Sequence, residues 1–435
     1  MKALLKKLIG YDKLYSLIKE SFIYQQRKKM MGKIANMLYG YPSKSFFVIG
    51  VTWTNGKTTT ANIIHTILNT CVAKTVMIST ANIKIGGKDI PNTKKMTSLD
   101  VFDLQSTLAT AKDSWCKIAI LEVSSHGLDQ YRFEGVAFDF AVLTNITHDH
   151  LDFHGTFERY VKSKEQLFRY VLENTKQSKY ASFPADDKIG RQWFEELPFD
   201  QKLNYSIVAS SNLKAENIQL SATWTTFTLN YLGKSYEVTT KLLGEFNVYN
   251  ILAALSVVLQ IGVTLPQSLE AIAWFDTVTG RMDQIEHNGI HYFVDFAHTP
   301  DALDKTLEYL SKIKWTGRLI TLFWATGNRD KTKRPAMGEI ADRYSDILIA
   351  TDDDPDIENR LEIIQQLTSK ISHKTLGKDF FLLPERTLAI KFATDIAKPG
   401  DIVMLAGKGH ETVQYTNFGK RKRSDKEEVI KNFTS

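Results

Sequence analysis

The stretch Phe46-Phe47-Val48-Ile49-Gly50-Val51-Thr52-Trp53-Thr54-Asn55-Gly56-Lys57-Thr58-Thr59-Thr60 decides the fold of this chain. An apolar run with β character ends in a polar, glycine-bearing turn, and an Ala/Ile/Leu run with helical spacing follows over residues 61–68. Strand, glycine-bearing loop and helix, in this order, form the context that a phosphate-binding loop requires. In such a loop, Lys57 would reach the β- and γ-phosphates of a nucleotide, and the Thr58 hydroxyl would bind Mg²⁺.

The spacing of this loop departs from the common pattern. Five residues separate Gly50 from Gly56, where the standard motif has about four. Trp53 also places an indole where a backbone should approach phosphate. The alternative is a strand-to-helix turn with an incidental lysine. Because strand, loop and helix agree, nucleotide binding is favoured.

Composition describes an ordinary globular protein. A length of 435 residues predicts two or three domains. The two cysteines, Cys71 and Cys116, cannot build a disulfide framework or a thiolate metal site, which fits the reducing cytoplasm. No apolar run approaches the ~20 residues of a membrane span, and the N-terminus has no signal-peptide core. We therefore expect a cytoplasmic protein.

The N-terminal segment is basic. Residues 1–44 hold ten Lys or Arg against two acids, so the remainder is near neutral and no nucleic-acid partner is expected. Leucines recur at helical spacing between the lysines, which predicts a helical arm over residues 1–43. The arm could lie on an anionic membrane surface or pack on the body of the protein with its lysines solvated; we favour packing.

Strands and helices alternate from residue 46 to about 180. Strands are expected at 76–80, 118–123 and 138–145. A helix is expected at 98–112, with Thr97 or Ser98 as its cap and Asp100 in its first turn. Such alternation indicates a parallel sheet with ligands at the carboxyl ends of its strands, where Glu122 and Asn145 fall.

A second domain of the same kind is expected after a boundary near residue 280. Short alternating runs over 200–240 suggest antiparallel strands, and 244–261 reads as a helix. Strands are then expected at 291–295, 318–323, 347–351 and 401–406. The predicted fold is therefore α/β: a central parallel-sheet ATPase domain with a phosphate loop over 44–280, and a Rossmann-like doubly wound domain over 281–435.

Several side chains could take part in chemistry. Glu122 closes a buried strand, where a carboxylate is a natural Mg²⁺ ligand or a simple helix cap. His148, His150 and His154 stand close together, but Mg²⁺ prefers oxygen ligands, so the cluster alone is a weak metal signal.

Longer stretches resemble the Mur ligases. The resemblance is carried by residues 52–60 and by the stretches 121–132, 145–156, 244–250, 280–282, 295–303, 329–335 and 406–411. The resemblance covers about residues 45–420. Ser124-Ser125-His126-Gly127-Leu128 and Gly407-Lys408-Gly409-His410-Glu411 are typical of the branch that adds the third residue of the peptidoglycan stem peptide. The family's phosphate loop shares the longer glycine spacing.

This resemblance implies an ATP- and Mg²⁺-dependent amide ligase. Its substrates would be UDP-N-acetylmuramoyl-L-Ala-D-Glu and an amino acid. ATP would phosphorylate the D-glutamate carboxylate, and the amine would attack the acyl phosphate. A monomer is expected.

The family's roles carry over by position. Catalytic roles fall to Lys57, His150 and Lys164, the last as a carbamylated lysine. The metal ligands would be Thr58, Glu122, His150 and Lys164. The ATP contacts would be Thr52, Thr54, Asn55, Gly56, Lys57, Thr58, Thr59, Asn247, Asn250, Arg281, Asp295 and His298. The muramoyl-dipeptide contacts would be Thr97, Ser98, Ser124, Gln130 and Arg132. The incoming amino acid would meet Arg329, Asp353, Asp356, Gly407 and Glu411.

Two features depart from the family. Only about 44 residues precede the loop, so we expect the usual N-terminal UDP-binding domain to be missing. Asp353-Asp354-Pro355-Asp356 carries an aspartate where the diaminopimelate type has arginine, which favours a cationic side chain such as that of L-lysine; alternatively, these acids face solvent and specificity lies elsewhere. The alternatives are a non-catalytic ATP-binding module and a ligase resembling folylpolyglutamate synthetase; the stretch Ser124–Leu128 argues against the latter.

The tryptophans form a pattern of their own. Trp53 and Trp324 stand where the family has glycine, and Trp115, Trp224 and Trp274 stand where a turn glycine would be natural. One cause could explain the set, because some bacterial lineages read the codon UGA as glycine. We therefore predict that several of these residues are glycines in the native protein; the alternative is true tryptophans turned outward, with the loop intact.

Overall fold

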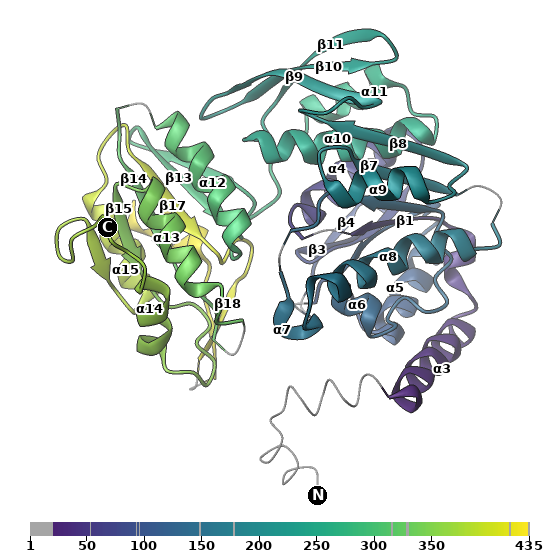
Figure 1. Cartoon of the computed structure of the whole chain (residues 1–435), viewed down its shortest axis with the longest axis horizontal. Helices are drawn as coiled ribbons and strands as arrows, with labels where there is room; N and C mark the ends of the chain where they lie inside the picture. The colour runs from purple at the N-terminus through teal and green to yellow at the C-terminus, as the bar shows by residue number, and fades with distance from the viewer. Residues whose placement is uncertain are drawn as a thin grey trace, which may run out of the picture. The chain divides into compact units, whose positions relative to one another are not determined.

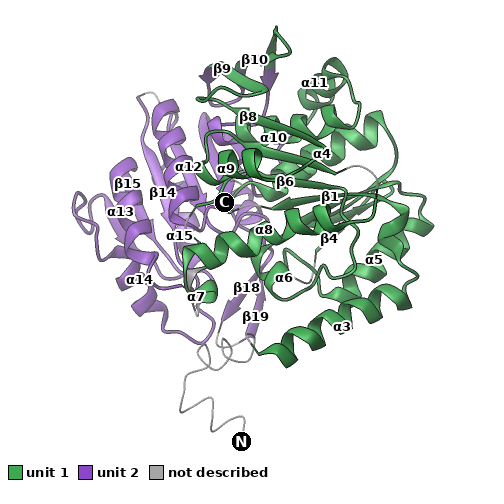
Figure 2. Cartoon of the chain, turned by 45° about the vertical axis from the view of Figure 1, so that its right-hand side comes forward, with its two compact units in different colours: residues 1–217, 227–238, 247–275 green, residues 218–226, 239–246, 276–435 purple. Residues whose placement is uncertain are grey.

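The computed structural model describes residues 21–433, except residues 53, 93, 95, 148, 177–178, 315, 328–329 and 417–418. The chain divides into two compact units (Figure 2). Unit 1 comprises Met1–Asn217, Phe227–Val238 and Asn247–Phe275, and unit 2 comprises Ile218–Thr226, Thr239–Phe246 and Asp276–Ser435. The domain boundaries expected from sequence, at residues 43/44 and 280/281, stay predictions.

The phosphate loop belongs to an eleven-stranded sheet with the order β11-β10-β9-β8-β7-β6-β1-β5-β2-β3-β4 (Figure 1). Its central strand β1 (Phe47–Thr52) pairs in parallel with β5 (Ile118–Val123) and with β6 (Phe140–Leu143). The other strands are β2 (Thr75–Ile78), β3 (Asn82–Ile85), β4 (Lys88–Pro91), β7 (Tyr180–Pro184), β8 (Gln201–Ser206), β9 (Leu213–Leu220), β10 (Thr225–Tyr231) and β11 (Lys234–Thr240).

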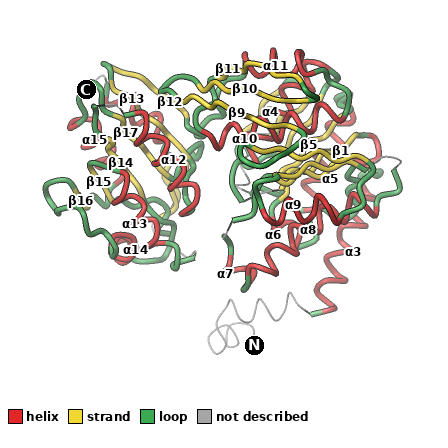
Figure 3. The backbone as a smooth tube through the Cα atoms, turned by 45° about the horizontal axis from the view of Figure 1, so that its top comes forward, coloured by secondary structure: helices red, strands yellow, loops and turns green. Residues whose placement is uncertain are grey.

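Helices cover both faces of this sheet (Figure 3). Isoleucines and leucines of α4 (Lys57–Cys71) are buried, as its apolar spacing predicts, and α8 (Phe157–Glu173) buries Leu167, Phe168 and Val171. The other helices with a described backbone in unit 1 are α3 (Phe22–Leu38), η1 (Pro42–Ser45), α5 (Val101–Asp113), α6 (Ser125–Asp129), α7 (Leu151–His154), α9 (Lys188–Glu196) and α11 (Leu265–Ala273). Most of α10 (Glu245–Gln260) also belongs to this unit.

Two details of the sequence prediction are wrong. Helix α5 begins at Val101, because Asp100 is its N-cap and accepts a hydrogen bond from the Phe102 N–H at 3.4 Å, so Asp100 does not lie in the first turn. Strand β8 pairs in parallel with β7 and β9, although its alternating pattern suggested an antiparallel strand. An alternating strand fits either direction, so its partner decides.

Unit 2 contains a six-stranded sheet with the order β12-β13-β17-β14-β15-β16. All neighbours are parallel except β12 with β13. The strands are β12 (Asp283–His287), β13 (Ile290–Asp295), β14 (Leu319–Phe323), β15 (Ile347–Ala350), β16 (Phe380–Leu382) and β17 (Ile402–Ala406). A separate pair, β18 (Val413–Thr416) and β19 (Gly419–Lys422), is antiparallel.

Successive residues of these strands point to two cores. Phe293 and Met404 lie in one core and Val294 and Val403 in the other, on opposite faces of the sheet. The helices of the unit are α12 (Pro300–Ile313), α13 (Arg334–Tyr344), α14 (Arg360–Thr368), α15 (Arg386–Ile396) and α16 (Asp425–Asn432). The α/β class and the doubly wound second domain are confirmed.

The N-terminal arm is described only in part. The leucines that predict its first helix lie in residues 1–20, outside the described residues. Helix α3 packs against α5. Among the described residues, no helix is both long and apolar enough to cross a membrane.

Candidate functional site

The phosphate loop joins β1 to α4 as the sequence predicts. Gly56 is the N-cap of α4 and has a left-handed backbone, φ 84°, which glycine adopts without strain. The ammonium of Lys57 donates to the Thr54 carbonyl at 3.2 Å, so its side chain turns back over the loop. Thr58 and Thr59 are buried in the first turn of α4. The loop therefore brings together a cation and a helix N-terminus, an arrangement that suits an anion.

Contacts of the Thr54 hydroxyl attach the loop to the rest of unit 1. The Thr54 hydroxyl lies 2.8 Å from the Tyr160 hydroxyl and accepts from the Thr147 N–H at 3.2 Å. The Thr52 hydroxyl is fully buried and has no hydrogen-bond partner among the described residues. Trp53 lies outside the described residues.

Glu122 lies beside this loop. The parallel register pairs Val51 with Glu122 and Thr52 with Val123, so both strands end at the same edge. One carboxylate oxygen accepts from the Thr80 hydroxyl at 2.6 Å and from the Thr80 N–H at 3.1 Å. The other oxygen is buried with no hydrogen-bond partner among the described residues. Such an oxygen suits a divalent cation, which would replace the lost water contacts.

His150 follows β6 and belongs to an aromatic cluster. Its backbone is left-handed, φ 54°, and its ring lies 4.6 Å from the ring of His126, between centroids. The imidazole Nε2 lies 3.3 Å from the Asp149 carboxylate. His154 is buried and also faces His126. His148 lies outside the described residues.

Lys164 is fully buried on α8. Burial lowers the pKa of its amine well below the usual value, the positive charge of Lys57 lowers it further, and Asp149 opposes the shift. The nitrogen lies 4.8 Å from the centroid of the Tyr160 ring. A neutral, nucleophilic amine is the form that reacts with carbon dioxide.

Two asparagines line the start of α10. The Asn250 amide donates to Asn247 at 2.7 Å, and the Thr60 hydroxyl of α4 donates to Asn250 at 3.4 Å. Both asparagines are buried. The structure therefore connects them to the helix that carries the phosphate loop.

The residues expected to hold the dipeptide meet at the N-terminus of α6. Ser98 and Ser124 hydroxyls lie 2.8 Å apart, and Arg132 donates to the Ser98 carbonyl at 2.6 Å. The Gln130 side chain accepts from Arg132 at 2.7 Å. The Thr97 hydroxyl lies 3.0 Å from the Thr80 hydroxyl, which donates to Glu122, so the group continues into the candidate metal site.

In unit 2, Asp295 organises the residues expected to contact ATP. Burial raises the pKa of its carboxyl, while the positive charge of Arg281 and the Met282 N–H, 2.7 Å away, oppose the shift. The Arg281 guanidinium lies 4.7 Å from the Phe296 ring centroid. The His298 ring nitrogen Nδ1 lies 2.7 Å from the Phe296 carbonyl. The three predicted residues therefore meet around one short segment after β13.

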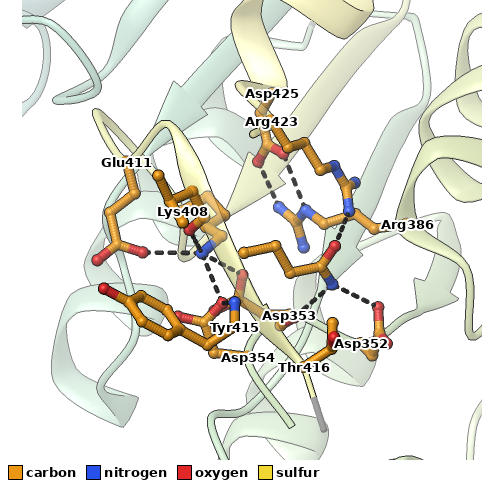
Figure 4. Close-up of polar contacts among 12 residues, drawn as sticks. Asp352, Asp353, Asp354, Arg386, Lys408, Glu411, Tyr415, Thr416, Arg423 and Asp425 are labelled. Atoms are coloured by element: carbon orange, nitrogen blue, oxygen red, sulfur yellow. Dashed lines mark hydrogen bonds and ion pairs between the residues drawn. The ribbon is translucent and has the colours of Figure 1, made fainter. Parts of the chain in front are cut away.

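A cluster of carboxylates surrounds Lys408, and we call it the Lys408 cluster (Figure 4). The Lys408 ammonium lies 2.9 Å from one oxygen each of Asp353, Asp354 and Glu411, and donates to the Val413 carbonyl at 2.8 Å. Burial would lower the pKa of Lys408, but the three carboxylates outweigh it and raise the pKa. Burial raises the pKa of Asp353 to about 7, partly opposed by Lys408.

Charged residues behind the Lys408 cluster form further polar contacts. Asp425 accepts from buried Arg386 at 3.0 Å, and Gln414 links Arg423, at 3.0 Å, to Asp352, at 3.2 Å (Figure 4). The Gln414 contacts therefore attach β18 to the segment that follows β15, and the Arg386–Asp425 pair joins α15 to α16. Of the predicted amino-acid contacts, Asp353 and Glu411 come together. Gly407 has φ 103° and directly follows β17. Asp356 is exposed with φ 54°, and Arg329 lies outside the described residues.

Sequence reasoning gave no site role to three residues: Thr80, Tyr160 and Lys408. Thr80 follows β2 in a stretch without a motif, and Tyr160 reads as a core aromatic. Lys408 had a signal, because it lies inside Gly407-Lys408-Gly409-His410-Glu411 and follows a strand.

Most of the chain is similar to known proteins. Residues 51–258 match the Mur ligase middle domain, and residues 280–409 match the Mur ligase glutamate ligase domain. A UDP-N-acetylmuramyl-tripeptide synthetase of Roseiflexus is 36% identical over 393 residues, which cover 88% of this chain and 77% of that protein. A UDP-N-acetylmuramoyl-L-alanyl-D-glutamate--2,6-diaminopimelate ligase of Halalkalibacterium halodurans is 37% identical over 393 residues, covering 90% and 79%.

Solved structures resemble the chain as well. A UDP-N-acetylmuramoyl-L-alanyl-D-glutamate--2,6-diaminopimelate ligase is 30% identical, with a TM-score of 0.64, and the match covers 93% of this chain and 83% of that one. The folylpolyglutamate synthase of Mycobacterium tuberculosis has a TM-score of 0.71 at 15% identity, covering 87% and 92%, and shares the fold.

Proposed function

The chain belongs to the Mur ligase family, and on this premise we propose that it joins an amino acid to UDP-N-acetylmuramoyl-L-alanyl-D-glutamate with consumption of ATP. One observation supports the proposal most strongly. The register of β1 and β5 sets Glu122, with one unsatisfied buried oxygen, beside the phosphate loop. A loop for phosphates and an oxygen ligand for their counter-ion are what phosphoryl transfer needs.

The loop residues would bind the nucleotide. Lys57 neutralises charge on the transferred phosphoryl group, and the N-terminus of α4 orients the phosphate chain. Thr58 and Glu122 would hold Mg²⁺, with His150 from the neighbouring loop. When bound, Mg²⁺ supplies positive charge against the phosphate oxygens. Asn247 and Asn250, and in unit 2 Arg281, Asp295 and His298, would bind the rest of ATP.

Lys164 would serve as a carbamate. Its depressed pKa supports this role, because only the neutral amine attacks carbon dioxide. The carbamate changes a buried amine into an anion that could hold a second cation near Lys57. Burial of an anion is tolerated only with such a partner.

The acceptor would lie at the N-terminus of α6. Ser98, Ser124 and Arg132 present hydroxyl and guanidinium groups to a carboxylate-bearing dipeptide, with Thr97 and Gln130 beside them. Phosphorylation of the D-glutamate carboxylate gives an acyl phosphate. The amine of the incoming amino acid then attacks its carbonyl carbon and expels phosphate.

The incoming amino acid would be a diamino acid, with L-lysine preferred over meso-diaminopimelate. The Lys408 cluster supports this preference, because three carboxylates surround a single ammonium and leave excess negative charge. Excess negative charge attracts a terminal ammonium and repels a second carboxylate. The proposed contacts also include Asp356 and the three residues that the family resemblance assigns to this role, Arg329, Gly407 and Glu411.

Amino-acid-dependent release of phosphate from ATP tests this function. The assay contains UDP-N-acetylmuramoyl-L-alanyl-D-glutamate and either L-lysine or meso-diaminopimelate. Release that needs both acceptor and amino acid supports the ligase, and faster turnover with diaminopimelate overturns the preference for lysine. ATP binding without release would indicate the non-catalytic module, and release only with a folate acceptor would indicate the folylpolyglutamate-type ligase. We also propose that the protein acts in the cytoplasm, where ATP is made.

A further inference from the structure

Helix α3 packs on unit 1 through its small residues. Gly32, Ala35 and Asn36 are buried. A Cβ added at Gly32 would lie 2.5 Å from Cβ of Glu134, so glycine is what lets the helix approach so closely. The Asn36 side chain packs on Gly135 in the same way. This face explains how α3 is attached, and its fully buried residues are small or polar.

Four large apolar side chains lie on the opposite side, which we call the outer face of α3. Ile23 is 80% exposed, Met30 56%, Ile34 39% and Met37 58%. Steps of seven, four and three residues place these four on one line along a helix. Figure 2 shows α3 along the outside of unit 1. An apolar line of this kind on a monomer's surface marks a site of interaction.

Basic residues flank the outer face. Arg27 and Lys33 are exposed on either side of the line. Residues 21–44 contain five Lys or Arg and neither Asp nor Glu. An apolar stripe between basic flanks is the composition of a helix that lies in the surface of an anionic membrane, with its apolar residues below the headgroups.

Charge favours an anionic membrane over two other possible occupants of the outer face, a second copy of the chain and residues 1–20. A second copy of the chain would bring another basic α3 against the first, with no acid in residues 21–44 to compensate. Residues 1–20 hold five Lys against Asp12 and Glu20, so this segment is also net positive. Like charges in direct contact are unfavourable, whereas anionic lipid complements both segments.

We propose that the outer face of α3 is a docking surface for an anionic lipid bilayer, which the helix joins without crossing. Each basic residue near such a surface strengthens binding about fivefold. The apolar residues supply the part of the affinity that salt does not screen. The proposal does not depend on the ligase activity.

Vesicle sedimentation of the full chain tests the proposal. The protein should pellet with vesicles of equal parts phosphatidylcholine and phosphatidylglycerol and stay in solution with phosphatidylcholine alone. Met30→Gln/Ile34→Gln should lower the partition coefficient at least about tenfold, since two apolar anchors are lost. Arg27→Gln/Lys33→Gln should lower it about thirtyfold and flatten its dependence on salt.

Leu361→Gln/Leu388→Gln is the matched control, because both leucines are 60% exposed on helices elsewhere. Its binding should equal that of the wild type, and circular dichroism should show that every variant is folded. Equal binding by the Met30/Ile34 variant, or no binding to anionic vesicles, overturns the proposal. So does a dimer in analytical ultracentrifugation that only the Met30/Ile34 variant abolishes, because the outer face would then bind a second copy.

Discussion

Trp115 occupies a backbone conformation that glycine usually takes. Its φ is 63° and its side chain is 74% exposed. The Trp115 N–H donates to the Lys112 carbonyl at 3.0 Å, and the Cys116 N–H donates to the Ala111 carbonyl at 3.1 Å. These two bonds form the Schellman motif that ends α5, with Trp115 at the left-handed position. A residue with a Cβ costs about 1 kcal/mol there.

Trp324 shows a second misfit. It is 5% exposed, and its indole nitrogen is buried with no hydrogen-bond partner among the described residues. A Cβ on Gly407 would lie 1.8 Å from that nitrogen. Trp224 and Trp274 are exposed beside a turn and at the end of α11. Trp193 differs, since it is buried and its ring lies 5.1 Å from the Phe168 ring, between centroids.

We therefore predict UGA codons at positions 53, 115, 224, 274 and 324, and UGG at position 193. Trp115→Gly should raise the free energy of unfolding by about 1 kcal/mol, measured by urea denaturation. Trp193→Gly is the control and should lower it by about 3 kcal/mol or more, because it empties a core site. UGG at 115 and 324 would end the hypothesis.

Lys57 carries the second prediction at this scale. Lys57→Ala should slow ATP turnover at least about a hundredfold, because it removes the charge that faces the transferred phosphoryl group. The residue contributes little to the core, so the thermal midpoint should stay within a few degrees. Lys88→Ala removes an exposed lysine from β4 and should leave turnover unchanged. A folded Lys57→Ala enzyme with normal turnover would contradict the assignment of the loop.

At the scale of elements, local pattern predicted the central strands of both large sheets and some of the helices. The apolar runs that became β1, β5 and β17 are buried on both faces, so they read as strands without any knowledge of their partners. The sequence pattern did not predict features that depend on neighbouring strands. The direction of β8 follows from its neighbours. In the hairpin β3–β4, Ile83 and Ile85 of β3 pack against the core while β4 is exposed, so the apolar pattern is short, although Gly86 and Gly87 signal the turn.

The candidate site was also predictable only where the signal is local in sequence. Residues inside motifs, such as Lys57 and Glu122, could be assigned from the chain alone. The contact of Lys408 with Asp353 could not, because the two residues lie far apart in sequence and meet only at the carboxyl edge of the second sheet. Burial of Lys164 was likewise invisible, since a lysine on an amphipathic helix usually faces water.

Gly338 supplies a prediction about helix packing. It lies on α13 where a Cβ would be 2.0 Å from the Leu367 carbonyl oxygen of α14. Gly338→Ala should therefore lower the free energy of unfolding of unit 2 by about 2 kcal/mol, despite the better helix propensity of alanine. Glu339→Ala, at the next and exposed position, is the control and should change it by less than about 1 kcal/mol. Equal effects in denaturant titrations would show that α13 shifts freely.

At the scale of the whole molecule, each unit has its own hydrophobic core, so each should unfold in its own transition. The two units also carry buried groups that respond to acid in opposite ways. His65 of unit 1 is buried next to Thr75, and Asp353 of unit 2 is buried next to Lys408. Folding lowers the pKa of His65 and raises the pKa of Asp353. A change of pH should therefore shift the two unfolding transitions in opposite directions and show which unit each belongs to.

Burial, with a smaller effect of Lys84, lowers the pKa of His65 to about 4. Between pH 6.5 and 4 the unfolded chain binds a proton that folded unit 1 does not, so acidification destabilises unit 1, by up to about 3 kcal/mol. The pKa of Asp353 is raised to about 7. As pH falls from 7 to 4, folded unit 2 holds a proton that the unfolded chain has released, so acidification stabilises unit 2 by an amount on the order of 4 kcal/mol.

Differential scanning calorimetry between pH 7 and pH 5 should reveal both effects as differences between wild type and variant. His65→Gln keeps a polar side chain without a titrating ring, so the transition of unit 1 should fall less with acid than in the wild type. Asp353→Asn removes the titrating carboxyl, so the transition of unit 2 should lose part of its gain. Each variant should leave the pH dependence of the other transition unchanged, because its titrating group belongs to one unit. If His65→Gln and the wild type lose stability equally between pH 7 and 5, then His65 does not remain neutral in the folded protein.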